Sequence, residues 1–174
     1  MKKLNLGCGY DIRPGWVNLD VVPLKGVDVV HDLAKHPLPF QNEAFEYVLC
    51  SDILEHIFDY PKVLREIHRV LRPGGLVEIR IPHYSYSRAY ADPTHVRFFS
   101  IETFDFFLKT SGRPYYYDFS FSEIASMKLT FRRGIIKPLV AWITNRNRKT
   151  YEFYEQSFLS SLCPAENIIV KLKK

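Results

Sequence analysis

The chain has 174 residues, enough for one globular domain with a substantial core and too few for two ordinary domains. Its composition, 47% hydrophobic with 25% charged residues, is that of a folded protein and excludes a largely disordered one. The net charge is +5, and the whole excess lies in residues 101–174, which carry 12 basic against 7 acidic side chains. A solvated basic face explains so small an excess more simply than a nucleic-acid or lipid partner does.

The amino terminus runs directly into a predicted strand, without the basic and apolar regions of a signal peptide. The longest apolar run, 134–144, is interrupted by Lys137 and Pro138 and is shorter than the roughly 20 residues that a membrane-spanning helix needs. The three cysteines are widely spaced and form no CxxC pair, which favours reduced thiols. We therefore expect a cytoplasmic protein.

Strands and one clear helix alternate in the first half of the chain. Short β-rich runs at 3–6, 16–22, 27–33 and 46–52 are each followed by turn or loop residues. Apolar residues then recur at helical spacing over 60–71, and a Pro-Gly-Gly turn separates this amphipathic helix from a strand at 76–81. Strand, helix, turn and strand in this order predict a parallel crossover.

The second half is less regular. The segment 82–100 has no clear period and is rich in His, Tyr, Arg and Asp, which is typical of a functional loop at the edge of a sheet. After it we expect a helix over 101–110, a strand over 121–133, a helix over 149–162 and a final strand over 166–174.

A glycine turn and an acidic strand end point to a nucleoside ligand. Gly7 and Gly9 follow the first strand, where glycine lets the backbone approach a ligand closely. Asp20 ends the second strand, where its carboxylate can accept hydrogen bonds from both ribose hydroxyls. Either signal is weak alone, and together they indicate an adenosine-containing cofactor.

The motifs LNLGCG, NLD, HDLAKHPLPFQNEAFEYVLCSDILEHI and VLREIHRVLRPGGLVEIRIP stand in one order over residues 3–82. In this order and spacing they resemble the class I S-adenosylmethionine-dependent methyltransferases of the small-molecule branch, with a type 11-like domain. The resemblance implies a Rossmann-like α/β fold, with a mostly parallel seven-stranded sheet flanked by helices. It also implies a single methyltransferase domain over 1–174, with a cofactor-binding half at 3–82 and an acceptor-binding, sheet-completing half at 83–174.

The same resemblance implies S-adenosylmethionine as cofactor and assigns its contacts. The glycine loop would meet the methionine part, Asp20 the ribose, and Asp32 with Leu33 the adenine, while Ser51 would form the adjoining wall; the complete expected set is Gly7, Cys8, Gly9, Asp20, Asp32, Leu33 and Ser51. For Asp32, a turn or helix-cap role is the alternative.

One departure from the family pattern concerns the first crossover. Only residues 7–15 separate the first two predicted strands, whereas a parallel crossover normally takes a dozen residues or more and contains a helix. We therefore expect the first helix to be shortened or missing, and Tyr10, Asp11 and Arg13 to take over its contacts to the methionine carboxylate and amine.

Methyl transfer from a sulfonium needs alignment first and a base second. For a hydroxyl acceptor a neutral histidine suits proton removal near pH 7, and we expect His95 in this role, with His83 as second candidate. Asp92 would orient the imidazole or contact the acceptor, unless the Asp-Pro-Thr-His segment is only a turn. A metal held by these three residues has no supporting spacing, so no metal is predicted.

The sequence leaves the acceptor open. By analogy with small methyltransferases that have a similar loop, we expect an enzyme of class EC 2.1.1 that methylates a small molecule, with a hydroxyl of a sugar or lipid-linked glycan first. Two alternatives stay open: an RNA or other nucleic-acid methyltransferase, and a non-catalytic methyltransferase-like partner protein. Peripheral membrane contact through the basic, apolar segment 132–149 is open too, as is the oligomeric state.

Overall fold

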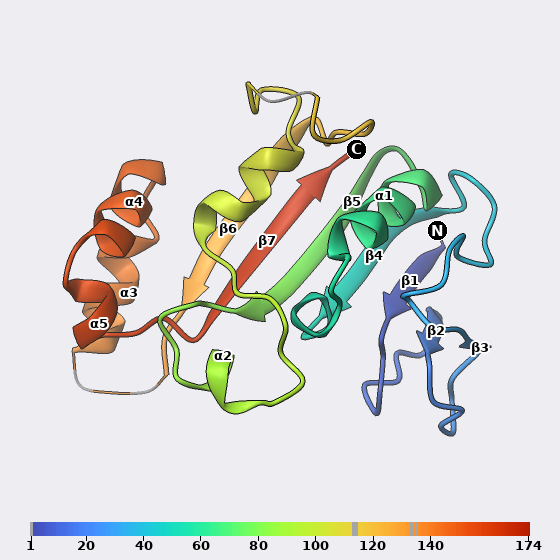
Figure 1. Cartoon of the computed structure of the whole chain (residues 1–174), viewed down its shortest axis with the longest axis horizontal. Coiled ribbons are helices and arrows are strands. Elements are labelled where there is room, and N and C mark those ends of the chain that lie inside the picture. The colour runs from blue at the N-terminus through green and yellow to red at the C-terminus, as the bar shows by residue number, and fades with distance from the viewer. Residues whose placement is uncertain (1, 113–114, 133, 135) are drawn as a thin grey trace.

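The computed structural model describes residues 2–112, 115–132, 134 and 136–174. Its strands form one seven-stranded sheet in the order β3-β2-β1-β4-β5-β7-β6 (Figure 1). Their bounds are β1 Lys3–Leu6, β2 Val17–Asp20, β3 Val29–Val30, β4 Phe45–Ser51, β5 Leu71–Pro82, β6 Glu123–Thr130 and β7 Asn167–Lys173. Strands β1 to β5 pair in parallel and β7 runs antiparallel to both β5 and β6, so the predicted mostly parallel sheet is confirmed.

The helices are short and fall into two groups. The helix α1 (Tyr60–Val70) packs on one face of the sheet. The 3₁₀ helix η1 (Leu54–His56) precedes it in the chain, and the short α2 (Arg88–Ala91) and the 3₁₀ helix η2 (Ile101–Phe107) follow β5. The helices α3 (Lys137–Thr144), α4 (Arg148–Gln156) and α5 (Leu159–Leu162) cluster at the β6 edge (Figure 1).

The amphipathic helix over 60–71 is confirmed as α1. Its apolar stripe is buried against the sheet, and Pro61 stands in its first turn, where the missing backbone N–H is not needed. The stripe consists of Val63, Leu64, Ile67 and Val70. Strand β5 begins at once after the helix, so the Pro-Gly-Gly turn lies inside the strand and not before it.

The missing first helix is also confirmed. All of the residues between β1 and β2 are described, and none of them is helical. The side chain of Asn18 replaces the helix as the support of this loop: its Oδ1 accepts from the Arg13 N–H at 2.9 Å, and its Nδ2 donates to the carbonyl oxygens of Arg13 and Trp16 at 3.2 and 3.3 Å. Asn5 adds a hydrogen bond from its Nδ2 to the Asp11 carbonyl oxygen at 2.7 Å. Both asparagine side chains are buried in place of a helix backbone.

The second half differs from expectation in its helices. The helix expected over 101–110 is a 3₁₀ helix over residues 101–107, and Ser100 and Thr103 form a capping box at its start. The helix expected over 149–162 is divided into α4 and α5 at Ser157, whose extended backbone ends α4. The strand expected over 121–133 is β6, and its predicted end at Arg133 lies outside the described residues.

Glu66 on α1 fixes the loop that precedes β4. Its Oε2 accepts from the Leu38 N–H at 2.7 Å, and Arg69 binds both its carboxylate and the carbonyl oxygens of Leu38 and Phe40. Burial works to raise the pKa of Glu66, but the hydrogen bonds from Arg69 and Leu38 outweigh it and lower that pKa below its ordinary value of 4.5.

We expect Glu66 to make folding sensitive to acid. A carboxyl whose pKa is lower in the folded than in the unfolded state stabilises the fold above its unfolded value, here 4.5, and that stabilisation is lost as the pH falls through the folded value. Urea unfolding of wild type and Glu66→Gln between pH 7 and pH 3 checks this. The wild type should lose its stability advantage over the variant below about pH 4.5; a constant difference at all pH values would contradict the assignment.

Candidate functional site

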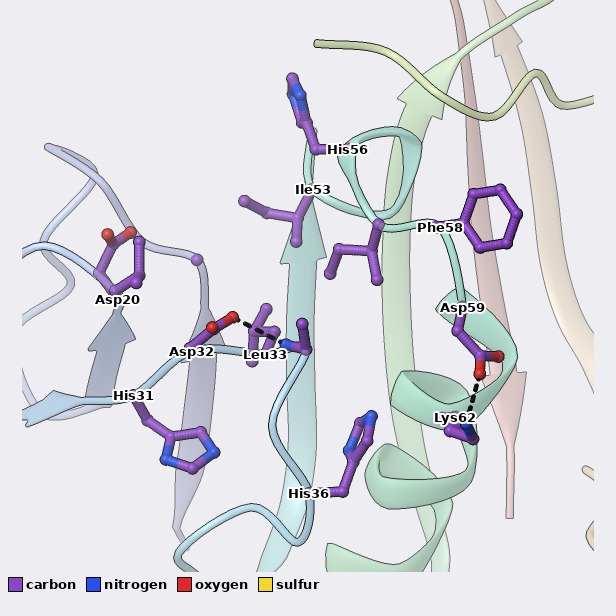
Figure 2. Close-up of a pocket in the computed structure, with 14 residues that line it drawn as sticks. Asp20, His31, Asp32, Leu33, His36, Ile53, His56, Phe58, Asp59 and Lys62 are labelled. Atoms are coloured by element: carbon purple, nitrogen blue, oxygen red, sulfur yellow. Dashed lines mark hydrogen bonds and ion pairs between the residues drawn. The ribbon is translucent and has the colours of Figure 1, made fainter.

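A cavity of about 470 Å³ opens at the carboxyl ends of β1, β2 and β4. Such edges of parallel sheets are where ligands usually bind, and the volume lies in the range of small-molecule sites. Figure 2 shows Asp20, His31 and Asp32 on one side of the cavity and Ile53, Phe58 and Lys62 on the other.

The glycine loop begins at a position that strongly favours glycine. Gly7 has a φ of +62°, where other residues are strained, and a Cβ built there would clash with Cδ1 of Ile53, another residue that lines the cavity. Gly9 faces open space, with no atom within 4 Å of a built Cβ. The Cys8 side chain is buried, and desolvation, followed by the charge of Asp20, raises the pKa of its thiol. Of the three loop residues expected at the cofactor, Gly7 lines the cavity, whereas Cys8 and Gly9 lie outside its described lining.

Asp20 joins the glycine loop to the end of β2. Its Oδ2 accepts from the Gly9 N–H at 2.7 Å and its Oδ1 from the Val22 N–H at 2.9 Å. Each carboxylate oxygen has a second lone pair, so the group can still accept from two neighbouring hydroxyls. Asp20 lines the cavity with only 9% of its surface exposed, which makes it a strong acceptor in a largely dehydrated position.

Asp32 and Leu33 also line the cavity. The Oδ1 of Asp32 accepts from the Ala34 N–H at 2.9 Å, so the turn role considered for it is realised. Among the described residues none donates a side-chain hydrogen bond to its Oδ2, and this oxygen can bind a ligand amino group. Leu33 is 8% exposed and contributes an apolar surface at the boundary between cavity and core.

The cavity suits an adenosine group, which needs paired acceptors for its ribose hydroxyls, an acceptor for its amino group and apolar walls. Asp20, Asp32 and the walls formed by Leu33, Ile53 and Ile57 supply these features. The three residues expected to contact the methionine part, Tyr10, Asp11 and Arg13, lie outside the described lining of the cavity. Tyr10 is 90% exposed, and Arg13 forms an ion pair with Asp11 at 2.9 Å. Ser51 donates to Asp52 at 3.0 Å at the end of β4 and lies outside the described lining too.

A second cavity, of about 600 Å³, adjoins the first, and His56 lines both. Its lining is polar and charged, and comes from the strand ends of β4, β5 and β7 and from the loop around α2; it includes Arg80, Tyr86, Arg88, Asp92, His95 and Asn167. His95 and Asp92 of the sequence prediction are therefore brought together beside the first cavity.

His95 is held in a defined orientation. Its Nδ1 lies 2.9 Å from the carbonyl oxygen of Ala89, and its Nε2 lies 4.0 Å from Oδ2 of Asp92. Its ring packs edge-on against His56, with the two centroids 4.7 Å apart. Asp92 in turn accepts from the N–H and the hydroxyl of Thr94, and these hydrogen bonds lower the pKa of its carboxyl.

His83 is placed differently. It is fully buried, its Nδ1 lies 2.8 Å from the Ser85 hydroxyl, and its Nε2 lies 2.8 Å from Oε1 of Glu155. The described lining of neither cavity includes it. The ring connects the loop after β5 to α4, which leaves no ring nitrogen directed at a ligand.

Glu55 is the site residue that the sequence analysis misses. It is 1% exposed and lines the second cavity. Desolvation, opposed by its own backbone N–H and assisted by Asp52, raises its pKa to about 7. The available signal is a lone acidic residue in the apolar run Ile53–Leu54 and Ile57, directly after a buried parallel strand.

The hydrogen bonds from Asn18 to the loop between β1 and β2 predict a measurable effect on the stability of the fold. Asn18→Ala leaves the Arg13 N–H and other polar groups of the first crossover without partners, and we expect a loss of about 2–4 kcal/mol in the free energy of unfolding. Urea unfolding measures it, with the exposed Asn42→Ala as control, which should change the value by less than about 1 kcal/mol. Equal effects of the two substitutions would show that the asparagine does not support the loop.

Comparisons with known proteins agree with this geometry. A family profile described as a methyltransferase domain matches residues 4–79. Demethylmenaquinone methyltransferases from Lysinibacillus sphaericus and Listeria welshimeri are 40% identical over 57 residues and 44% identical over 64 residues, which is 33% and 37% of this chain. The matches cover only 24% and 27% of those relatives, so the chain aligns with about a quarter of their length.

Solved structures extend the likeness to the whole chain. A S-adenosylmethionine-dependent methyltransferase from Archaeoglobus fulgidus superposes with a TM-score of 0.65 and 16% identity, over 99% of this chain and 86% of that protein. One from Mesorhizobium loti gives a TM-score of 0.59 and 18% identity, over 99% and 90%. At this identity the likeness shows a common fold.

Proposed function

We propose that this chain is a class I S-adenosylmethionine-dependent methyltransferase that binds its cofactor in the first cavity and methylates a small molecule in the second. The observation that carries the proposal is the junction of the two cavities at His56, because methyl transfer requires donor and acceptor side by side. When bound, S-adenosylmethionine supplies a methyl group activated by its sulfonium.

The chain's own residues would bind and orient that cofactor. Asp20 accepts from the ribose hydroxyls, Asp32 from the adenine amino group, and Leu33 packs on the adenine ring. The backbone of the glycine loop, Gly7 to Gly9, borders the methionine part. Ser51 lies outside the described lining of this cavity; its hydroxyl donates to Asp52 in the lining of the second cavity and so orients that carboxylate.

The acceptor would lie between β5 and the loop around α2. There the imidazole of His95 and the carboxylate of Asp92 face the same cavity, where an acceptor hydroxyl can transfer its proton. This division keeps residues 3–82 as mainly the cofactor half and 83–174 as mainly the acceptor half. His83 has no part in it, since both of its ring nitrogens are already hydrogen-bonded inside the protein.

We favour a hydroxyl of a sugar or a lipid-linked glycan as acceptor. Arginine, tyrosine and asparagine side chains line the second cavity, which suits a ligand with many hydroxyls. The exposed rings of Tyr90 and Phe98 stack at a centroid distance of 4.5 Å and offer a flat surface to a sugar ring. Demethylmenaquinone, named for the relatives, is a second candidate, supported only by the 57 and 64 residues over which they align with this chain.

A lipid-linked acceptor fits the surface of α3 to α5. Leu139, Trp142, Phe158 and Leu162 are at least 60% exposed, and Arg146 covers the Trp142 ring at 5.0 Å. Within the described residues, no helix has both the length and the apolar character to cross a membrane. Two residues of the segment 132–149, Arg133 and Ile135, lie outside the described residues.

Co-sedimentation with anionic vesicles tests peripheral contact with a membrane. Protein that stays in the supernatant would favour a free sugar as acceptor over a lipid-linked one.

The proposed function is tested by measuring the transfer of a labelled methyl group from S-adenosylmethionine to three panels of acceptors. The panels are sugars with lipid-linked glycans, demethylmenaquinone, and RNA. We expect labelled product from the first panel and its loss in His95→Asn. Labelled RNA, with binding that weakens steeply with salt, would replace the proposal with a nucleic-acid methyltransferase. Cofactor binding without product from any panel would support a non-catalytic partner protein.

A further inference from the structure

Three side chains from two separate segments converge where the cavities meet. Glu55 and His56 belong to η1, and His95 follows α2. One nitrogen or carboxylate oxygen from each lies within 4.8 Å of those of the other two. The described part of the chain contains one buried side-chain nitrogen or oxygen without a hydrogen-bond partner, and it is Oε2 of Glu55. Because an unpaired buried atom of this kind costs about 1–3 kcal/mol, it calls for a partner that the described residues do not supply.

The two imidazoles are oriented for the same ligand. The Ala89 carbonyl can only accept, so Nδ1 of His95 carries the proton and Nε2 of the neutral ring has a free lone pair. The Thr94 hydroxyl donates to Asp92 at 2.6 Å and therefore accepts from Nδ1 of His56 at 2.8 Å. This leaves Nε2 of His56 with a lone pair as well. Metal-binding histidines are typically held in this way through their second ring nitrogen.

The surroundings of the cluster favour a cation. Asp52 and Asp92 line the same cavity as Glu55, and of the two arginines in that lining Arg80 pairs with Asp52 at 3.0 Å. Asp92 remains nearly half exposed beside His95. The lining of this cavity holds four carboxyl groups, from Asp52, Glu55, Asp92 and Glu166, against two arginines, so acidic groups are in excess around the two imidazoles.

We propose that Glu55, His56 and His95 bind one divalent transition-metal ion at this junction. Two imidazoles and a carboxylate form the ligand set of catalytic Zn²⁺ and Fe²⁺ sites, which leave further positions open. Ligands about 2.1 Å from one ion lie at most about 4.2 Å apart, so the exposed His56 ring closes slightly on binding. Resting on the proposed function, the ion would hold an oxygen of the acceptor at an open position facing the second cavity. A metal-bound His95 has no free lone pair, so the proton of the acceptor hydroxyl would pass to the carboxylate of Asp92, which lines the same cavity. This favours a hydroxyl-bearing acceptor.

The test is Co²⁺ binding to the tag-free, chelator-treated full chain, followed by visible absorption and by equilibrium dialysis. We expect one Co²⁺ per chain, displaced by Zn²⁺. Affinity should fall at least 100-fold in Glu55→Gln and in His95→Asn, and about tenfold in Thr94→Val, which keeps the side-chain shape but cannot hold His56. The controls Glu102→Gln and His68→Asn, outside the cluster, should bind like wild type.

The binding of S-adenosylhomocysteine, measured on the same proteins, separates this inference from the proposed function. Wild type that binds S-adenosylhomocysteine but neither Co²⁺ nor Zn²⁺ would overturn the metal site alone, as would Co²⁺ binding unchanged in His95→Asn. Wild type that binds the metal but not S-adenosylhomocysteine would overturn the proposed cofactor site and leave the metal site standing. Normal S-adenosylhomocysteine binding by the variants shows that they are folded.

Discussion

Asp20→Ala should reduce the affinity for S-adenosylhomocysteine at least about 100-fold. The substitution removes both acceptors proposed for the ribose hydroxyls, and hydrogen bonds to a charged group contribute about 1.5–3 kcal/mol each. It also removes the partner of the Gly9 N–H, so the glycine loop loses one of its hydrogen bonds to the end of β2, while the one from the Cys8 N–H to the Leu19 carbonyl oxygen remains. The cofactor should therefore lose direct contacts and the loop that borders its methionine part.

Ligand-induced thermal stabilisation measures this loss. At a concentration 100 times the wild-type dissociation constant, S-adenosylhomocysteine should stabilise wild type by about 2.7 kcal/mol and Asp20→Ala by about 0.4 kcal/mol or less. Asp20→Asn, which preserves the shape, should lie between them. Asp11→Asn is the matched control, because its exposed carboxylate stands in the same loop outside the cavity lining. Equal stabilisation of wild type and Asp20→Ala would place the cofactor elsewhere.

Glu55→Leu should abolish methyl transfer while making the protein more stable. The carboxylate is 1% exposed and its Oε2 has no partner, so an apolar side chain of similar size relieves about 1–3 kcal/mol of desolvation cost. The same substitution removes the only carboxylate of the proposed metal cluster. Stability and function should therefore change in opposite directions, as expected where a strained polar group serves a site.

Urea unfolding and the labelled-methyl assay together check this prediction. Binding of S-adenosylhomocysteine should stay at the wild-type level, because Glu55 lines the second cavity and not the first. Glu102→Leu on the exposed start of η2 is the control and should change neither activity nor stability appreciably. A less stable Glu55→Leu protein, or one with full activity, would show that the carboxylate has a structural role only.

The sheet and several residues that line the first cavity could be predicted because their signals are local. Short apolar runs mark β1, β2 and β4, the glycine turn follows β1 directly, and Asp20 ends β2. Parallel strands place such ends at one edge whatever the details of packing, so Asp20, Asp32 and Leu33 come to line one cavity. The short first crossover was readable for the same reason, since chain length alone excludes a full helix there.

The acceptor side could not be predicted to the same depth, because its contacts join distant segments. The burial of His83 depends on Glu155, which is 72 residues away in sequence. The cluster of Glu55, His56 and His95 forms only when the loop after α2 packs on η1, where the N–H groups of Val96 and Arg97 donate to the Glu55 carbonyl oxygen. The sequence prediction of no metal considered His83, Asp92 and His95, which the fold does not bring together as a set.

A calorimetric titration of the wild-type full chain with S-adenosylhomocysteine shows whether a first crossover without a helix, supported by Asn18, still forms a cofactor site around Asp20. We predict saturable binding at one site per chain, competed by S-adenosylmethionine. Absence of binding by a folded, monodisperse protein would contradict it, and with it the proposal that this chain is a working methyltransferase.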